Sequence, residues 1–210
     1  MNATSGWLAG KRALVAGSGA ILVDVAAALR KSGATVVDGC RAATDDHEGA
    51  LSDAEVALGG NVDLLVHGGA SIEVRASEAT SLQQWRAGVS ADLDGRFLQT
   101  AAFARRCISV GRPGSILYLL PSRALAAGRV GRATSLGAVT NLIKTLAVEW
   151  ARDGIRINGI ASRACEDPAS VGPVVRSSLG NLSAYLLSDY AAYITGMVTG
   201  INELATGEPT

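Results

Sequence analysis

The side chains that could carry out acid–base or metal chemistry are few and dispersed. The only histidines are His47 and His67, and no two of the three cysteines stand in a C-x-x-C spacing. This pattern argues against a zinc site and a disulfide framework, and we expect reduced thiols in the cytoplasm. No tyrosine stands four residues before any of the three lysines, so a phenol–ammonium pair for proton transfer is missing at that spacing. The lysines are Lys11, Lys31 and Lys144.

A glycine-containing turn is the other candidate for chemistry. Gly17 and Gly19 follow the first apolar run, at a place where glycines would let backbone N–H groups approach phosphates. Ala20 and Leu22 stand at the second and third glycine positions if Gly17 is the first glycine of a phosphate-binding loop. If Gly17 and Gly19 instead begin a G-x-G-x-x-G motif, Leu22 stands at the position of its last glycine. An isobutyl group there fills space that the phosphates and the helix need, and Asp24 adds negative charge. We therefore expect a structural turn without a cofactor.

The composition excludes several classes of protein. The 210 residues carry 19 basic and 19 acidic side chains, so no basic excess favours nucleic-acid binding. Hydrophobic residues make up 48%, which excludes a disordered chain, and no apolar run is long enough to span a membrane. The N-terminus shows no signal-peptide pattern, so we expect a cytoplasmic protein with a single domain over residues 1–210.

Short apolar runs alternate with helical patterns along the chain. The runs at 11–17, 34–38, 62–67, 115–120, 155–160 and 193–201 predict strands. The periodic segments at 21–31, 52–58, 81–109, 137–152 and 171–187 predict helices. In the segment 137–152, a buried stripe is expected from Val139 to Trp150. In the segment 81–109, one apolar face is predicted from residues at a spacing of four, which run from Trp85 to Phe97, and then from Ala101, Ala104 and Ile108. The alternation predicts an α/β fold, a Rossmann-like, doubly wound parallel sheet.

Three stretches resemble the short-chain dehydrogenase/reductase family. Residues 137–160 are similar to the family's long helix and following strand, residues 188–196 to its S-D-x-A-S-Y-I-T-G signature, and residues 8–15 to its N-terminal L-x-G-K-x-A-L-V. The resemblance covers nearly the whole chain and implies the family's NAD(P)-binding fold. Only 23 residues separate Asp38 from Val62, and Ala161 to Leu187 must hold both a lid and a helix. We therefore expect a truncated sheet in which the third strand and the substrate lid are reduced or missing.

The same resemblance places the family's catalytic positions. The tyrosine falls on Arg132, the lysine on Leu136 and the asparagine on Asp92, while Pro121 stands at the serine with Ser122 beside it. A guanidinium does not exchange a proton at neutral pH, and leucine carries no charge. The chain is thus expected to have no catalytic residues, with these five positions degenerate, no cofactor-binding residues and no metal site. His67, at the family's N-N-A-G position, is expected to be a loop residue with an ordinary hydrogen bond.

The features that remain are those of assembly. In the family, the two long helices form one dimer face and the last strand with its helix forms another. Closed symmetric assemblies are the usual outcome of such faces. The residues expected at a subunit interface are Trp85, Val89, Phe97, Val139, Leu146, Trp150, Tyr193, Ile194, Thr195 and Gly196.

The leading hypothesis is a non-catalytic structural or regulatory subunit, a pseudoenzyme. It pairs with an active homologue in a heterodimer or heterotetramer, and NAD or NADP binds to the active subunit of this alcohol dehydrogenase or ketoreductase. A CoA thioester is one substrate class considered; nucleic acid and membrane are not expected partners. Two alternatives stay open: an oxidoreductase with a non-standard site built on Asp92, Arg132 or Ser122, and a homomeric sensor that binds a ligand in the old cofactor cleft.

Overall fold

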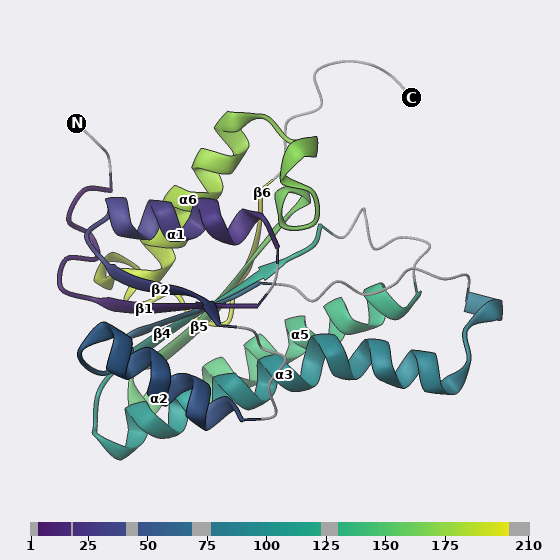
Figure 1. The fold of residues 1–210 in the computed structure, drawn as a ribbon, viewed down its shortest axis with the longest axis horizontal. Helices are drawn as coiled ribbons and strands as arrows, with labels where there is room; N and C mark the ends of the chain where they lie inside the picture. Colours follow the sequence, from purple (N-terminus) through teal and green to yellow (C-terminus); the bar gives the residue numbers. More distant parts are fainter. Residues whose placement is uncertain (1–3, 18, 41–45, 69–76, 123–129, 202–210) are drawn as a thin grey trace.

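The computed structural model describes residues 4–17, 19–40, 46–68, 77–122 and 130–201. Within these ranges, six strands form one parallel sheet in the order β2-β1-β3-β4-β5-β6 (Figure 1). The strands are β1 (Arg12–Ala16), β2 (Thr35–Cys40), β3 (Leu64–His67), β4 (Gly114–Leu120), β5 (Ile155–Ser162) and β6 (Val198–Ile201). The α-helices are α1 (Ile21–Lys31), α2 (His47–Leu58), α3 (Leu82–Ser109), α5 (Val130–Glu149) and α6 (Pro173–Leu187). The fold confirms the predicted Rossmann-like architecture.

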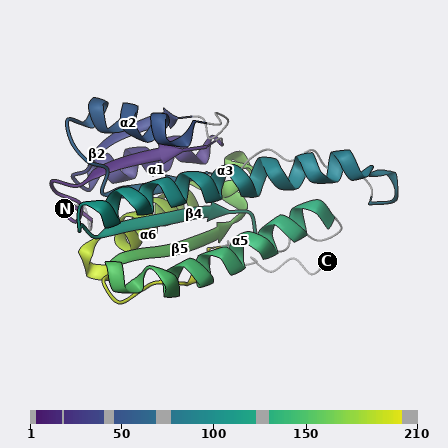
Figure 2. The same ribbon diagram turned by 90° about the horizontal axis from the view of Figure 1, so that it is seen from below.

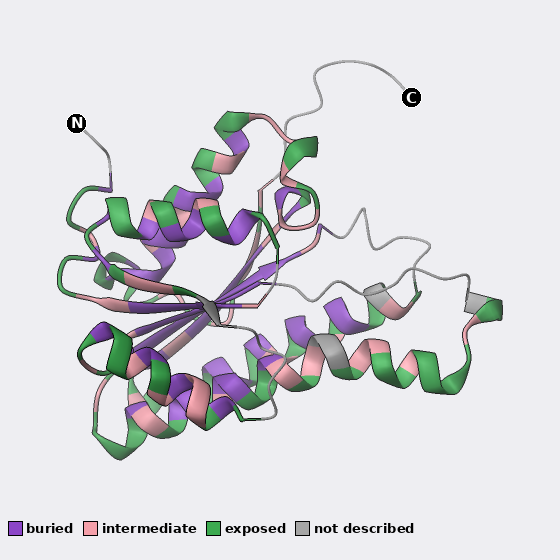
Figure 3. Ribbon diagram, in the orientation of Figure 1, coloured by how far each residue is buried: buried purple, intermediate pink, exposed green. Residues whose placement is uncertain are grey.

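Helices cover both faces of the sheet. Helices α1 and α6 lie on one face, and α2, α3 and α5 lie on the other (Figures 1 and 2). Each face has its own apolar core, with Phe103 and Ile143 in the core under α3 and α5 and with Leu29 and Leu179 in the core under α1 and α6. The central strands are buried along their length (Figure 3), as expected for a sheet covered on both faces.

Close approach of α1 and α6 depends on a glycine. A Cβ atom added at Gly180 would lie 2.8 Å from the Cβ of Ala28, which is closer than two such atoms can approach. The two helices therefore pack at this point because one of them has no side chain. A Cβ at Gly137 in α5, by contrast, would meet no atom within 4 Å.

Two elements differ in extent from the prediction. Helix α2 begins at His47, not at residue 52, because the Asp46 side chain accepts a hydrogen bond from the Gly49 N–H at 2.7 Å and caps the first turn. Strand β6 begins only at Val198, not at residue 193. The residues before it bond to the side chain of Asn158: Nδ2 donates to the Ile194 carbonyl at 2.8 Å, and Oδ1 accepts from the Met197 N–H at 3.2 Å.

The predicted apolar face of α3 is correct at Ala104, which is buried, and wrong at Phe97 and Ile108. Phe97 and Ile108 are 41% and 45% exposed, whereas Phe103 and Cys107 are buried. A step of four residues turns a helix by about 40° beyond a full turn, so a stripe at that spacing drifts around the helix. The buried face instead includes polar residues, among them Arg96 and Thr100. The predicted stripe of α5 is confirmed, since Val139, Ile143, Leu146 and Trp150 are all buried.

The truncation is confirmed at both places. Within the described residues, β2 is the edge of the sheet and one helix, α2, connects the β2 side to β3, so no strand lies outside β2. Between β5 and α6 the chain forms two short 3-10 turns, Arg163–Cys165 and Pro168–Ser170, in place of a two-helix lid. In the part of the chain described, no helix is both long and apolar enough to cross a membrane.

Candidate functional site

The carboxyl ends of β1 and β3 define the place where a site is expected. The chain leaves β1 toward β2 on one side and resumes at β3 on the other, so the loops after these strands diverge there. The two loops are in contact: the Gly68 N–H donates to the Ala16 carbonyl at 2.8 Å. A Cβ at Gly17, whose φ is +103°, would lie 2.8 Å from the Gly68 oxygen. Only glycine fits this position, as the sequence suggests, but the fit is to the neighbouring loop.

The first turn of α1 has few free donors for a phosphate. Its Leu22 N–H donates to the Gly19 carbonyl at 3.1 Å, and its Val23 N–H donates to the Ala20 carbonyl at 3.2 Å. Ala20 has helical backbone angles and contributes no side-chain cap. Anion sites at helix N-termini use N–H groups that have no intrahelical partner. Two of the N–H groups that a pyrophosphate would need are therefore already bonded within the chain.

Two side chains near this loop lie differently from the expectation. Leu22 is only 8% exposed and belongs to the core between α1 and the sheet, so its isobutyl group fills helix–sheet space and is not directed into the loop. Asp24 does not leave an uncompensated charge at the helix start. Its two carboxylate oxygens accept hydrogen bonds from the Arg176 guanidinium at 2.7 and 2.8 Å. The charge argument against a phosphate is therefore wrong for Asp24, because Arg176 of α6 neutralises it.

The side that would hold the adenosine is also altered. The Asp38 carboxylate, which could have bonded a ribose, pairs with Arg30 of α1 at 3.2 Å. No described strand lies beyond β2 to form a wall for the base. These contacts and the bonded N–H groups of α1 engage groups that a dinucleotide would otherwise bond. We therefore derive no chemical step through such a cofactor.

The positions that match the family's catalytic residues lie on α3, α5 and the end of β4. Leu136 is 8% exposed and packs in the core, and its carbonyl accepts a hydrogen bond from Thr140 Oγ1 at 2.7 Å. Pro121 is partly exposed; Ser122 is 4% exposed, and its hydroxyl has no hydrogen-bond partner. The side chains of Asp92 in α3 and Arg132 in α5 lie outside the described residues.

A buried polar cluster that sequence reasoning missed joins β3, α3 and β4. His67 is fully buried at the end of β3, and its Nε2 lies 3.0 Å from Thr100 Oγ1. The same oxygen lies 2.6 Å from the Tyr118 hydroxyl, and the Arg96 guanidinium lies over the tyrosine ring at 5.7 Å from its centre. His67 thus has the expected hydrogen bond, but it is a strand residue and not a loop residue. Arg96 and Thr100 are one helical turn apart, which is the signal that could have identified this polar face.

Burial determines the charge of His67. It lowers the pKa of the imidazole to about 3, with smaller lowering by the nearby charges of Arg96 and His47. The ring is therefore neutral at physiological pH and holds no proton to donate as an imidazolium. Its Nδ1 has no hydrogen-bond partner. The cluster is suited to holding α3 against the sheet, with a neutral imidazole at physiological pH.

The expected interface residues divide into three groups. Val139, Leu146 and Trp150 lie in the chain's own core, so burial within the chain and not a partner accounts for these three. Trp85, Val89 and Phe97 are partly or largely exposed on α3, whose N-terminal part extends beyond the strands (Figures 1 and 2). In the last segment, Tyr193 is fully exposed and Ile194 packs against the core. The Thr195 hydroxyl oxygen accepts a hydrogen bond from the Ile157 N–H, and the Gly196 N–H donates one to the Ile157 carbonyl. The interface itself stays a prediction.

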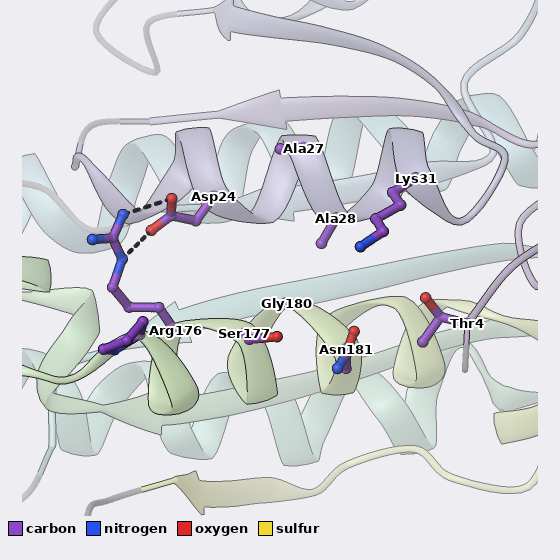
Figure 4. A pocket seen from close by; sticks show the side chains of 10 residues that line it. Thr4, Asp24, Ala27, Ala28, Lys31, Arg176, Ser177, Gly180 and Asn181 are labelled. Carbon is purple, nitrogen blue, oxygen red and sulfur yellow. Dashed lines mark hydrogen bonds and ion pairs between the residues drawn. The ribbon is translucent and has the colours of Figure 1, made fainter. Parts of the chain in front are cut away.

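A shallow groove of about 450 Å³ lies between α1 and α6 (Figure 4). Its lining includes the Asp24–Arg176 pair and Lys31, with the Gly180–Ala28 contact at its floor. The groove follows from the packing of two helices with small residues between them. Among the described residues, no group of histidine, cysteine and acidic side chains could hold a metal ion.

Comparisons with known proteins bear on the whole chain. Residues 9–171 match the family model described as short chain dehydrogenase. Among curated relatives, the chain is 29% identical over 204 residues to a cis-4-hydroxycyclohexanecarboxylate dehydrogenase of Sinomonas cyclohexanicum, an alignment that covers 85% of this chain and 80% of the relative. It is 28% identical over 173 residues to an uncharacterized oxidoreductase of Caenorhabditis elegans, covering 71% of this chain and 55% of that protein.

The length of the chain limits these comparisons. The aligned part is 55% of the C. elegans relative and 44% of a D-threitol dehydrogenase of Mycolicibacterium smegmatis, which is 32% identical and aligned over 53% of this chain. The chain therefore spans about half the length of these relatives.

Solved structures give a closer match in shape. A short-chain type dehydrogenase/reductase of Mycobacterium marinum superimposes with a TM-score of 0.79 at 26% identity, over 93% of this chain and 94% of that one. A gluconate 5-dehydrogenase of Burkholderia cenocepacia, crystallised with NADP and tartrate, superimposes with a TM-score of 0.78 at 24% identity, over 96% and 97%. The second likeness shows the fold alone.

Proposed function

The chain belongs to the short-chain dehydrogenase family, and on that premise we propose that it serves as a non-catalytic subunit. It pairs with an active homologue in a hetero-oligomeric NAD(P)-dependent alcohol dehydrogenase or ketoreductase, and the cofactor binds to the homologue. A dehydrogenase for a CoA thioester, such as hydroxy(phenyl)methylsuccinyl-CoA, is among the assemblies to test. The role of this chain is to stabilise the partner or complete its site.

One observation carries the proposal. Leu136, at the position that matches the family's lysine, is buried in an apolar core and offers no charge. No tyrosine precedes any lysine of the chain at the required spacing, so a shifted alignment does not restore the pair. Without that pair a substrate oxygen has no proton donor of matched pKa. The bonded N–H groups of α1 and the absence of a described strand beyond β2 support the same conclusion for the cofactor.

The surface left for a partner supports the second half of the proposal. Leu82 is 63% exposed, and Phe97 and Leu98 are 41% and 46% exposed, along the side of α3. Exposed apolar side chains are typical of surfaces that contact another protein, and we propose that those of α3 meet the partner. Polar side chains on the same helix, such as Arg96, face the chain's own sheet instead.

The test is co-expression with a homologue that retains the intact tyrosine–lysine pair and the glycine-rich loop. We expect the two chains to purify as one complex, with NAD(P)-dependent turnover that the present chain alone lacks. Phe97→Asp should abolish the complex, and Val56→Asp, an equally polar change at an 83% exposed site on α2, should leave it intact. Turnover by the purified chain alone would overturn the proposal.

A second candidate is an oxidoreductase with a non-standard active site. The buried Ser122 hydroxyl, which has no partner among the described residues, favours it because such a group can bond a substrate oxygen. This candidate requires turnover by the chain alone and its loss in Ser122→Ala. The same assay therefore separates the two functions.

A further inference from the structure

Strand β2 is an edge of the sheet. It pairs with β1 on its inner side, and in the described part of the chain no strand lies on its outer side. An edge strand presents unpaired backbone N–H and C=O groups that can pair with another chain. Natural proteins cover or disrupt such edges. The backbone groups on the outer side of β2 therefore need a partner or a side chain that covers them.

The register shows which residues turn outward. The Thr35 N–H donates to the Lys11 carbonyl at 3.0 Å, so Thr35 bonds inward to β1. Alternate residues of a strand direct their backbone groups to opposite sides, and Val37 therefore also bonds inward while Val36 and Asp38 turn outward. The Val36 carbonyl confirms this direction, because it accepts a hydrogen bond from the Arg30 guanidinium at 3.1 Å and not from β1.

The β2 edge carries one positive and one negative side chain, so it is complementary in charge to the same edge of a second copy. Arg30 also pairs with the Asp38 carboxylate at 3.2 Å, and the two side chains are 46% and 44% exposed. An ion pair so exposed contributes little stability, so exchange for the same contact with another molecule is not costly. Arg30 and Asp38 lie next to each other on this edge. If two copies pair through a two-fold axis, Arg30 of each copy meets Asp38 of the other copy.

We propose that the outer edge of β2 is an interface at which a second copy of this chain adds its own β2 in antiparallel orientation. The two-fold axis passes beside Val37, so that Val36 of each copy lies opposite Asp38 of the other. Each such pair exchanges two backbone hydrogen bonds, as antiparallel pairs do, and the sheet continues from one copy into the next. Arg30 of each copy turns from its own Val36 carbonyl to Asp38 of the other copy.

This inference does not depend on the proposed function. The β2 edge lies across the sheet from β4, β5 and β6, and the exposed face of α3 is a separate surface. If both surfaces are used, two copies of this chain form the centre of an assembly and an active homologue binds to each. The β2 interface can then fail while the heteromeric complex persists, and the reverse also holds.

The experiment is sedimentation velocity on the purified chain and four variants. Val36→Pro removes an N–H that faces outward, so it blocks the added strand without loss of a bond to β1, and Val36→Ala is the matched control. Asp38→Lys places like charges opposite each other and should raise the dissociation constant at least about tenfold. The double change of Arg30→Asp with Asp38→Arg restores complementary charges and should restore association.

The expected result is that Val36→Pro and Asp38→Lys halve the mass of the assembly, while Val36→Ala and the double change keep it. Asp38→Lys also provides the test if the proline variant does not fold, as judged by circular dichroism. An unaltered mass in both disruptive variants would overturn the proposal, whether that mass is a monomer or an assembly through α3. Failure of the double change to restore association would do so as well.

Discussion

The buried His67 should make the stability of the protein depend on pH in a defined way. Folding lowers the pKa of His67 from 6.5 to about 3, so below pH 6.5 the unfolded chain binds a proton that the native chain does not. The contribution of His67 to stability is then complete above pH 6.5 and is lost as the pH falls toward 3. The slope reaches about 1.4 kcal/mol per pH unit, and the full loss is about 5 kcal/mol.

The assay is urea unfolding of the native protein and of His67→Gln at a series of pH values from 7.5 to 4. Glutamine keeps a donor for Thr100 but does not titrate, so the difference between the two free energies of unfolding should change by about 1.4 kcal/mol per pH unit below 6. Carboxylates titrate equally in both proteins and cancel in that difference. Tyr118→Phe is the control, because it removes the 2.6 Å contact with Thr100 but should not alter the slope. Parallel curves for the native protein and His67→Gln would refute the reasoning.

Three further predictions concern packing, the last segment and the thiols. Gly180→Ala should lower the free energy of unfolding by about 1–3 kcal/mol, because the added methyl group meets Ala28 of α1. Gly137→Ala should raise the free energy of unfolding by about 0.5–1 kcal/mol, because the added methyl group meets no other atom within 4 Å. Thermal unfolding measures the direction of both changes, and destabilisation by both variants would contradict the packing. Asn158→Ala should lower the free energy of unfolding by about 2 kcal/mol and speed amide exchange in the segment before β6, since both hydrogen bonds of the buried Asn158 side chain are lost. Unaltered amide exchange in that segment would show that the Asn158 side chain does not hold it. Burial raises the pKa of Cys107 to about 11 and that of Cys165 to about 12, so alkylation mapped at both sites at pH 8 should be slow until the chain unfolds; rapid labelling of the native protein would contradict it.

Periodicity and stop signals were sufficient to predict most of the fold. Helix α1 was predicted from Ile21 to Lys31 and has those bounds, because an apolar stripe runs into a glycine at residue 33. The loss of a strand beyond β2 followed from the number of residues available. The first turn of α2 was missed, since it is stabilised by the Asp46 cap and not by an apolar pattern.

The site was less predictable because its contacts join distant segments. The Arg176 side chain that neutralises Asp24 is 152 residues away in the chain, and no local pattern indicates that pair. The bond from His67 to Thr100 spans 33 residues and depends on how α3 lies on the sheet. By contrast, the missing tyrosine–lysine pair needed only the identities of the residues.

The proposed function depends most on the prediction that this chain does not bind the nicotinamide cofactor of its family. Isothermal titration of the purified chain with NADH and with NADPH tests it most directly. We predict no saturable heat for either nucleotide up to millimolar concentration, since two amides of α1 are already bonded and no described strand lies beyond β2 to hold the base. A stoichiometric site with a micromolar dissociation constant for either nucleotide would contradict the account.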